Sequence, residues 1–461
     1  MKARLALALV TTLMFPVLDL SAAGKPGGGT GCQNPIPINP VWNSCTSGSQ
    51  LSGCLDATFN GTGLETTSIS GNPEPVAVKQ TAAGNLFVIG QVNYSNGTGA
   101  VAIVHYLPNG QLDQGFGSGG TLIDQIAGSN SIFGTYDAGM DASGNLLVLI
   151  SLSKGYAVRR YSPSGVSDAT FNNNAQSSFS GLTIDRPDAL HVQSDGKIVI
   201  SGDYISSKKV VGFAFRLNSD GTADSTFGSK GLVLVSSLAI ARGAALQSIG
   251  ASQDLVLGGT ASNGFALVRL TPSGSIDATF GSGGIAITSH CQTAAIFSLA
   301  TDAAGNILAA GSTQLTTNGA SKMLIARYSA TGVLDTTFGD PSSSSGTRTG
   351  TTVLDIFGGT NQVTEVAPAM DSSGHILLAG NGYGSAGKFL FLARYSANGT
   401  LDSTFGSGGV AATNFGNDNN FVMQLPASNL TIQSNGELVV TGGATLVSGG
   451  SSVFGVARYW Q

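Results

Sequence analysis

The chain carries its most complete repeat at residues 393–406, which read Ala-Arg-Tyr-Ser-Ala-Asn-Gly-Thr-Leu-Asp-Ser-Thr-Phe-Gly. The Asp-x-Thr-Phe core of this stretch recurs along the chain, and successive Phe residues lie between 53 and 67 positions apart. The copies, of which the second is looser, end at Phe59, Phe116, Phe171, Phe227, Phe280, Phe338 and Phe405. Self-similarity at this period predicts a repeat architecture, in which one supersecondary unit is copied and stacked against its neighbours.

Two further phrases alternate with this core. A polar turn containing glycine precedes a β-rich run, as in residues 193–202, which read Gln-Ser-Asp-Gly-Lys-Ile-Val-Ile-Ser-Gly. A second apolar run ends in Arg-Tyr or Arg-Leu, as at Arg394 and Tyr395. Short β-rich runs bounded by Asn-Gly, Asp-Gly or Ser-Gly are typical of hairpins. We therefore predict four short strands in each repeat, the last one following a Gly-Gly tail.

Four short antiparallel strands per repeat are typical of the blade of a β-propeller. Each phrase occurs seven times, so we predict an all-β fold, a seven-bladed β-propeller of four-stranded antiparallel blades. A parallel β-helix is less favoured, because its turns are much shorter than this period. The chain enters with the Asp-x-Thr-Phe phrase at residues 55–59 and exits with Arg458 and Tyr459. We expect the N-terminal segment to add the outer strand to the last blade, since an uncovered sheet edge favours aggregation.

The phrases at residues 393–406 and 193–202 resemble the bacterial delta-60 repeat, and the resemblance covers residues 54–461. It implies an exported or surface-associated bacterial propeller. It supplies no catalytic residues.

The N-terminus has the pattern of a signal peptide over residues 1–23. Lys2 and Arg4 precede a mostly apolar run at residues 5–18, and small residues follow up to Ala23. Residues 24–53 are rich in Gly and Pro and are expected to form a linker before the propeller at residues 54–461. No later segment is apolar for long enough to span a bilayer. We therefore expect export to the periplasm, the cell surface or the medium.

Export permits disulfides. Cys32, Cys45 and Cys54 cluster in sequence while Cys291 stands apart, so a bridge among the first three is favoured, although the pairing stays open. A zinc site is less favoured, because no histidine lies near these cysteines.

Charge limits the classes of partner. The net charge is −5, and only 10% of residues are charged. A nucleic-acid-binding surface would need clustered Lys and Arg, so we expect no nucleic-acid partner. We expect a monomer.

The repeated carboxylates are the most conspicuous chemical feature. They are Asp56, Asp113, Asp168, Asp224, Asp277, Asp335 and Asp402. Calcium would need six to eight oxygen ligands, and each phrase offers one carboxylate. We favour a structural role, in which the side chain accepts nearby backbone N–H groups and shapes the turn.

An arginine precedes most of these carboxylates by eight residues. The arginines are Arg160, Arg216, Arg269, Arg327 and Arg394, and His105 takes the same place before Asp113. This constant offset predicts that each guanidinium folds back onto its carboxylate. Asp56 and Arg458 lack such a partner, so we predict that they pair with each other across the ring closure. The repeated Phe is expected to lie beneath its turn, against the next blade.

Catalytic signatures are not apparent. The four histidines are scattered, and the sequence contains neither a Gly-x-Ser-x-Gly elbow nor a His-Glu-x-x-His pair. We therefore assign no catalytic residue, no metal ligand and no cofactor.

Recognition is expected where the repeats differ. Alternate connections of antiparallel blades fall on opposite faces, and one face carries variable loops at residues 92–99, 203–209, 312–322, 381–388 and 443–452. Loops on a rigid scaffold commonly carry recognition. We expect a binding or scaffolding module for an unidentified protein or glycan. The alternative is a propeller enzyme, of the metal-dependent hydrolase or lactonase type, with a site at the central channel.

Overall fold

The computed structural model describes residues 50–125, 132–250, 252–261, 264–290, 293–315, 319, 321–340, 348–356, 362–384, 387–413, 430–445 and 452–461. The expected signal peptide, the first 26 residues of the expected linker, Cys32, Cys45 and Cys291 lie outside these residues.

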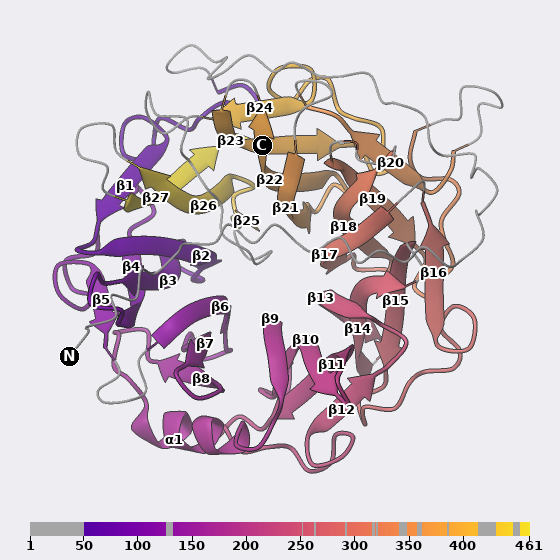
Figure 1. Ribbon diagram of the computed structural model, residues 1–461. Helices are drawn as coiled ribbons and strands as arrows, with labels where there is room; N and C mark the ends of the chain where they lie inside the picture. The colour runs from indigo at the N-terminus through magenta and orange to yellow at the C-terminus, as the bar shows by residue number, and fades with distance from the viewer. Residues whose placement is uncertain are drawn as a thin grey trace, which may run out of the picture.

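Seven antiparallel sheets are arranged as blades around a central axis, as predicted (Figure 1). Blade 1 contains β2 (Asn72–Gln80), β3 (Leu86–Asn93), β4 (Gly99–Tyr106) and β5 (Thr121–Asp124). Blade 2 contains β6 (Ile132–Met140), β7 (Leu146–Leu152) and β8 (Tyr156–Tyr161). Blade 3 contains β9 (Ile184–Val192), β10 (Ile198–Ser206), β11 (Lys209–Leu217) and β12 (Leu232–Val235). Blade 4 contains β13 (Ile240–Ile249), β14 (Ser252–Ala261), β15 (Gly264–Leu270) and β16 (Ile285–Ser289).

The remaining blades complete the ring. Blade 5 contains β17 (Thr293–Thr301), β18 (Ile307–Gln314), β19 (Ser321–Tyr328) and β20 (Thr351–Leu354). Blade 6 contains β21 (Gln362–Met370), β22 (Ile376–Gly384), β23 (Gly387–Tyr395) and β24 (Val410–Thr413). Blade 7 contains β25 (Leu430–Ile432), β26 (Leu438–Thr445), β27 (Ser452–Tyr459) and, from the N-terminal segment, β1 (Leu64–Ser68). The first strand of each blade lies next to the axis (Figure 1).

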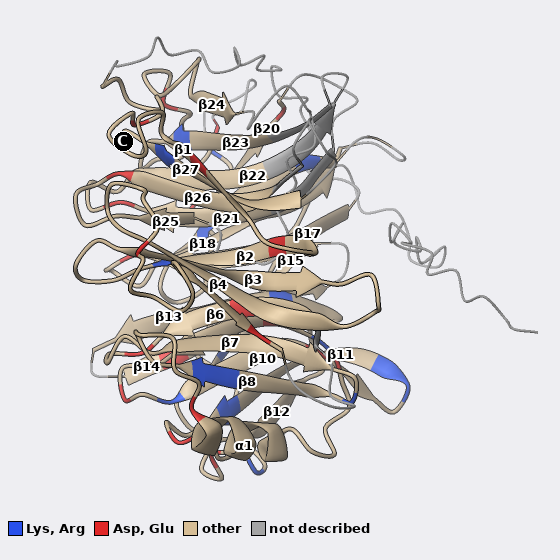
Figure 2. Cartoon of the chain, turned by 90° about the vertical axis from the view of Figure 1, so that its left-hand side faces the viewer, with Lys and Arg blue, Asp and Glu red and all other residues tan. Residues whose placement is uncertain are grey.

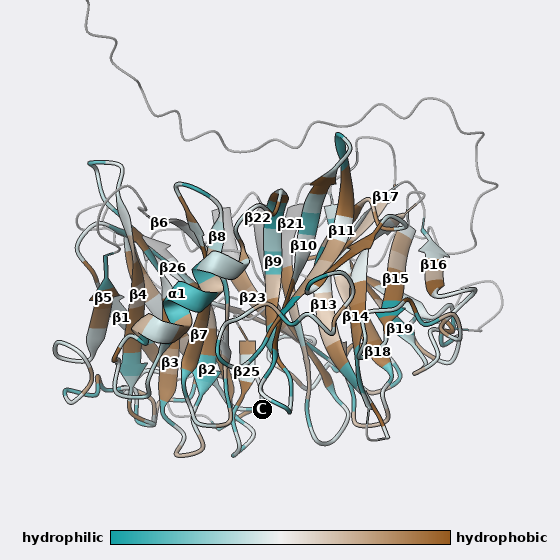
Figure 3. Ribbon diagram, turned by 90° about the horizontal axis from the view of Figure 1, so that it is seen from below, coloured by the Kyte–Doolittle hydropathy of each residue, from teal (hydrophilic) through white to brown (hydrophobic). Residues whose placement is uncertain are grey.

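The two faces of the ring carry different connections. Hairpins between the second and third strands open on one face, which we call the variable-loop face. The glycine turns and the Asp-x-Thr-Phe connections lie on the other, which we call the glycine-turn face. In Figure 3 the C-terminus marks the glycine-turn face at the bottom, and the β10–β11 hairpin rises at the top.

The apolar strands are buried because each blade is covered on both sides by its neighbours. All eight residues of β4 are buried, and apolar residues predominate within the blades (Figure 3). The repeated Phe residues join neighbouring blades. Phe280 of blade 4 is fully buried and packs in one cluster with Leu299 and Leu324 of blade 5. A Cβ at Gly332, which has φ +81°, would lie 2.7 Å from the Phe280 ring, so glycine is required where the next turn crosses it.

Blade 2 departs from the predicted four strands. Among the described residues it has three, and helix α1 (Ala169–Ser178) lies at its outer side (Figure 1). The Asp168 side chain accepts a hydrogen bond from the Phe171 backbone N–H and caps this helix. Glycines at positive φ follow the Phe in the other repeats, and Asn172, Asn173 and Asn174 take their place in blade 2. Without glycines at positive φ the chain does not reverse into a fourth strand. No helix of the described residues has the length and apolar character needed to span a membrane.

The N-terminal segment closes the ring, as predicted. β1 pairs antiparallel with β27, with Leu64 opposite Ala457. Two residues of the expected linker also contact the ring. The Gly406 backbone N–H of blade 6 donates to the Ser52 carbonyl at 3.0 Å, and the Gly53 N–H donates to the Trp460 carbonyl at 2.8 Å. Ser52 and Gly53 therefore provide the turn that, at other blade junctions, comes from the next blade.

The closure predicts the effect of truncating the N-terminus. Removing residues 24–49 is expected to leave thermal unfolding nearly unchanged, whereas removing 24–70 exposes the edge of β27 and favours aggregation. Removing 24–53 should give an intermediate stability, since Ser52 and Gly53 are lost. Light scattering and calorimetry on the three chains measure these effects. All three, and the full-length reference, carry Cys54→Ala, so that loss of a disulfide partner does not enter the comparison. Equal stability of the first and second chains would contradict this closure.

Candidate functional site

An arginine in each of six blades joins that blade to the next. Its guanidinium lies 2.6 to 2.8 Å from the repeated carboxylate and 4.3 to 5.0 Å from the centre of the repeated Phe ring. In five of these blades its Nη1 donates to a carbonyl of a turn in the next blade, at Ser219, Pro272, Ala330, Ala397 and Pro108. In blade 6 the acceptor is the Ser52 hydroxyl. The structure thus brings all six predicted arginines to their carboxylates.

The N-terminal and C-terminal segments are joined by the same kind of arginine–carboxylate pair. Arg458 donates from Nε and Nη2 to Asp56, with Nη2 at 2.6 Å, and the exposed fractions of the two side chains are 6% and 0%. The predicted pair across the ring closure is present, and among the six pairs only Arg216 and Asp224 are buried to a similar extent.

Blade 1 is the exception. His105 Nδ1 lies 3.0 Å from Asp113, and the imidazole stacks on Phe87 with 4.1 Å between ring centres. Burial lowers the pKa of His105, and the Asp113 carboxylate opposes this. A neutral imidazole therefore replaces the guanidinium in this blade at neutral pH.

The repeated carboxylates act within their own turns. Asp277 accepts hydrogen bonds from the backbone N–H and the hydroxyl of Thr279, at 2.9 and 2.7 Å. Its pKa lies below its usual value because the Thr279 hydroxyl and backbone N–H and the Arg269 guanidinium stabilise the ionised form. This arrangement accounts for the repeated Asp as a structural feature.

The innermost strands of blades 3 and 4 place two opposite charges at bulges. Asp188 is the extra residue of a bulge in β9, and Arg242 is the extra residue of a bulge in β13. Gly202 and Gly259 of the second strands lie opposite, and a Cβ there would meet the carbonyl oxygens of the inner strands at 2.2 and 1.7 Å. A bulge redirects its side chain relative to the regular ladder. Arg242 lies near the variable-loop end of β13, and Asp188 lies at the middle of β9.

Asp188 belongs to a charged network that joins blades 3 and 4. Its carboxylate lies 2.7 Å from Arg186 Nε. The Asp203 carboxylate accepts a hydrogen bond from the Ala241 backbone N–H of blade 4 at 2.8 Å. Burial raises the pKa of Asp188 to about 7, the Asp203 carboxylate adds to this, and the Arg186 and Arg242 guanidiniums oppose it. Groups with such displaced pKa values gather at functional sites.

A second group of charges lies nearer the glycine-turn end of the innermost strands and connects the blades. Asp137 of β6 accepts the Ala138 N–H at 2.7 Å and the Leu190 N–H of blade 3 at 2.8 Å. His191 Nε2 donates to the Ala244 carbonyl of blade 4 at 3.1 Å. Burial lowers the pKa values of Lys79 and His191, and Asp137 opposes both shifts. Four adjacent blades are connected through these side chains.

Tyrosines gather beside the network. The rings of Tyr136 and Tyr156 in blade 2 meet edge to face, 5.9 Å apart. The Tyr156 hydroxyl donates to the Asp185 carbonyl of blade 3 at 2.7 Å, and Tyr204 of β10 packs against Phe213. We call the surface formed by Tyr136, Tyr156, Tyr204, Arg186 and Arg242 the tyrosine sector. Each of its five side chains is half-buried.

Of this sector, only Tyr204 belongs to a stretch that the sequence indicated, the variable loop at residues 203–209, although a signal for the other tyrosines was present. Of ten tyrosines in the chain, five occupy the repeated position before the Asp-x-Thr-Phe phrase. Three of the other five belong to the tyrosine sector. Tyrosines outside the repeated position therefore indicate this surface. Of the variable loops, residues 92–99 and 203–209 are described, and the other three lie partly outside the described residues. Within the part of the chain that the structure describes, no group of three His, Cys, Asp or Glu is placed to hold a metal ion.

Six segments of the chain match the family model described as "Domain of unknown function (DUF5122) beta-propeller", at residues 84–116, 193–227, 255–280, 305–338, 372–405 and 433–461. Over these six segments the chain is similar to the repeats of this β-propeller family. The matched segments leave out residues 117–192, which include all three strands of blade 2 and helix α1. No curated protein matches the sequence.

Several solved structures share the fold at low identity. A protein of unknown function from Dyadobacter fermentans is 11% identical, with TM-score 0.40, over 86% of this chain and 98% of its own. The PQQ-bound aldose sugar dehydrogenase from Streptomyces coelicolor is 13% identical, with TM-score 0.39, over 72% and 95%. A gluconolactonase from Xanthomonas campestris is 12% identical, with TM-score 0.31, over 68% and 94%.

The buried pair at the closure can be compared with an exposed pair of the same kind. Arg458→Ala is expected to cost roughly 3–5 kcal/mol in unfolding free energy, because it leaves the Asp56 carboxylate buried without its cation. Arg160→Ala should cost about 0–1 kcal/mol, since Arg160 and Asp168 are 23% and 34% exposed. Double-mutant cycles on both pairs, by denaturant unfolding, give the coupling energies. A coupling below about 0.5 kcal/mol for Asp56 and Arg458 would contradict the assignment.

The raised pKa of Asp188 predicts a pH dependence of stability. Between about pH 4 and pH 7 the folded carboxyl keeps a proton that the unfolded chain has released, so its contribution to stability falls as pH rises through this window. Asp188→Asn should remove that fall, and the variant should gain stability relative to the wild type from pH 4 to 7. Unfolding at several pH values measures this difference, with the exposed Asp195→Asn as control. Parallel pH profiles for wild type and Asp188→Asn would contradict it.

Proposed function

We propose that the protein is an exported binding or scaffolding module that holds a protein or glycan partner on its variable-loop face, centred on the tyrosine sector. The observation that carries the proposal is the gathering of half-buried tyrosines and arginines there. Tyr and Arg are enriched among the residues that dominate binding energy, because they combine a large apolar surface with polar groups. The sector also lies where the chain departs from its own repeat.

A projecting hairpin favours a protein partner over a glycan. The β10–β11 hairpin extends from the variable-loop face, with basic residues at its tip (Figure 2). Ile205 and Val210 face each other near its tip and are 45% and 41% exposed. Ser207 and Lys208 adopt positive φ angles of 50° and 66° at the turn. Exposed β-branched side chains on a rigid projection suit an apolar protein contact, and the adjacent lysines suit an acidic rim.

Export is part of the proposal. It is supported by the signal-peptide pattern of residues 1–23 and by the resemblance to the delta-60 repeat. Cys54 is disulfide-bonded, as expected in an oxidising compartment. Sequencing the N-terminus of the exported protein would test cleavage after Ala23.

A propeller enzyme with a site at the channel is the second candidate. One observation favours it, the pKa of about 7 for Asp188 beside Arg186, since a carboxyl near neutrality can exchange protons. Asp137 and His191, in contrast, form hydrogen bonds to backbone groups, and these bonds favour a structural role for the two side chains over a catalytic one.

The hairpin provides the test of binding. Ile205→Asp/Val210→Asp should lower the affinity for a partner captured from cell-envelope extract at least about ten-fold, because it places charge in an apolar contact. Surface plasmon resonance with the purified partner measures this, and a glycan array tests the other class of ligand with the same variants.

A matched control lies on the opposite face. Ile276 and Val333 are 48% and 60% exposed in turns of the glycine-turn face, and Ile276→Asp/Val333→Asp should leave the affinity unchanged. Equal losses from both double variants would contradict the proposed face. If the wild type and the control variant bind the glycan array and the hairpin variant does not, the partner is a glycan instead.

A further inference from the structure

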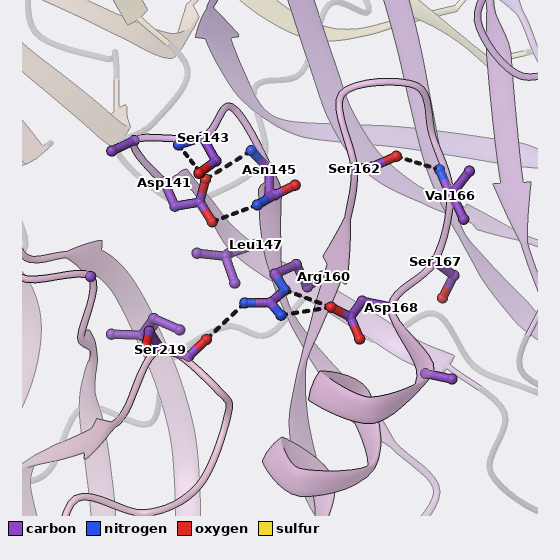
Figure 4. A pocket seen from close by; sticks show the side chains of 14 residues that line it. Asp141, Ser143, Asn145, Leu147, Arg160, Ser162, Val166, Ser167, Asp168 and Ser219 are labelled. Atoms are coloured by element: carbon purple, nitrogen blue, oxygen red, sulfur yellow. Dashed lines mark hydrogen bonds and ion pairs between the residues drawn. The ribbon is translucent and has the colours of Figure 1, made fainter.

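A polar cavity opens between blades 2 and 3 on the glycine-turn face, opposite the tyrosine sector. Its volume is about 640 Å³, within the range of small-molecule sites. Figure 4 shows the side chains that surround it, which come from the β6–β7 turn, from β8 and the start of α1, and from two turns of blade 3. Asp141, Asn145, Arg160 and Asp168 supply most of its charged and polar groups.

Two side chains that fill the corresponding place in blade 3 are shorter in blade 2, as they also are in blade 5, where Asp302 and Asn306 occupy these positions. In blade 3, Gln193 Oε1 accepts a hydrogen bond from Arg216 at 3.5 Å, and Lys197 Nζ lies 3.3 Å from Asp224. In blade 4, Gln247 accepts from Arg269 in the same way, at 3.0 Å. The shorter Asp141 and Asn145 occupy these positions in blade 2.

Both replacements are held away from the arginine by their own turn. The Asp141 carboxylate accepts the backbone N–H groups of Ser143 and Asn145, each at 2.9 Å, and the Asn145 side-chain amide at 2.8 Å. The dashed lines in Figure 4 show Asp141 engaged by this turn while Arg160 contacts Asp168 and Ser219. The space between the two groups stays open.

The side chains around this space provide both hydrogen-bond donors and hydrogen-bond acceptors. Three N–H groups of Arg160 are used, two on Asp168 and one on the Ser219 carbonyl, so two of the five guanidinium N–H groups remain. The Ser143 hydroxyl and the Asn145 side-chain carbonyl make no hydrogen bond within the described residues. Leu147 and Ile198 add an apolar patch.

The charge of the cavity disfavours anions. Two carboxylates, Asp141 and Asp168, face one guanidinium, Arg160. The pKa of Asp168 lies below its usual value because the Phe171 backbone N–H and Arg160 stabilise the ionised carboxylate. Arg160 is already paired with that carboxylate, so an anionic ligand would meet uncompensated negative charge.

We propose that this cavity binds a neutral sugar ring. The hydroxyl groups of such a ring both donate and accept, which matches the remaining Arg160 N–H groups on one side and Asp141, Asn145 and Ser143 on the other. Its C–H faces match Leu147 and Ile198. The site is separate from the proposed partner surface, since it lies on the other face of the ring.

Calorimetric titration of the full exported chain with D-glucose, D-galactose, D-mannose and D-glucuronate tests the proposal. At least one neutral sugar should bind saturably, and D-glucuronate should bind more weakly. Asp141→Gln/Asn145→Lys installs the side chains of blade 3, and it is expected to lower the affinity at least ten-fold without changing the thermal unfolding midpoint. Titration with methyl glycosides, whose anomeric hydroxyl is blocked, identifies the source of the ligand. If the affinity is retained, the ligand is the end of a glycan chain; if the affinity is lost, the ligand is a free sugar.

The reciprocal variant in blade 3, Gln193→Asp/Lys197→Asn, is the control and should leave the blade 2 site intact. The proposal is overturned if no neutral sugar binds, if D-glucuronate binds best, or if the blade 2 and blade 3 variants reduce binding equally.

Discussion

The arginine that stacks on the repeated Phe and pairs with the repeated Asp is the contact on which the ring depends. It connects its own turn to a carbonyl of the next blade, so one side chain defines both the local turn and the position of the neighbour. A guanidinium suits this role because its N–H groups point in several fixed directions and its flat face packs on an aromatic ring. A lysine could not make the same set of contacts.

Closure follows from the same contact. The ring closes only if the N-terminal and C-terminal segments of the chain form the same contacts that join the other pairs of neighbouring blades. Arg458 and Asp56 repeat the pair found between residues eight positions apart, although 402 positions separate them. Ser52 and Gly53 supply the turn to which blade 6 donates. Because the pair is buried, its loss would leave an uncompensated charge at the point where the chain ends are held together.

Several of the departures from the repeat lie in one part of the ring. Helix α1, the charged bulges and the tyrosine sector all belong to blades 2 to 4, and the open cavity lies between blades 2 and 3. Blade 2 is also outside the segments that match the family model. A repeated scaffold leaves few positions free to change, since most side chains hold neighbouring blades. Residues such as Tyr156 are therefore informative because they differ from their counterparts.

The sequence by itself determined the blades, their number, the closure by the N-terminal strand and the pairing of Arg458 with Asp56. These features repeat, so each copy supports the interpretation of the others, and a constant offset of eight residues is visible without coordinates. Only the tertiary structure decided that residues 169–178 form a helix, that Asp188 and Arg242 occupy bulges, and that Asp141 turns away from Arg160. Each of these depends on contacts that form only in the folded blades, and such contacts leave no periodic signal in the sequence. The physical reason is that repetition encodes the contacts that all blades share, whereas a contact formed in one blade alone has no second copy to reveal it.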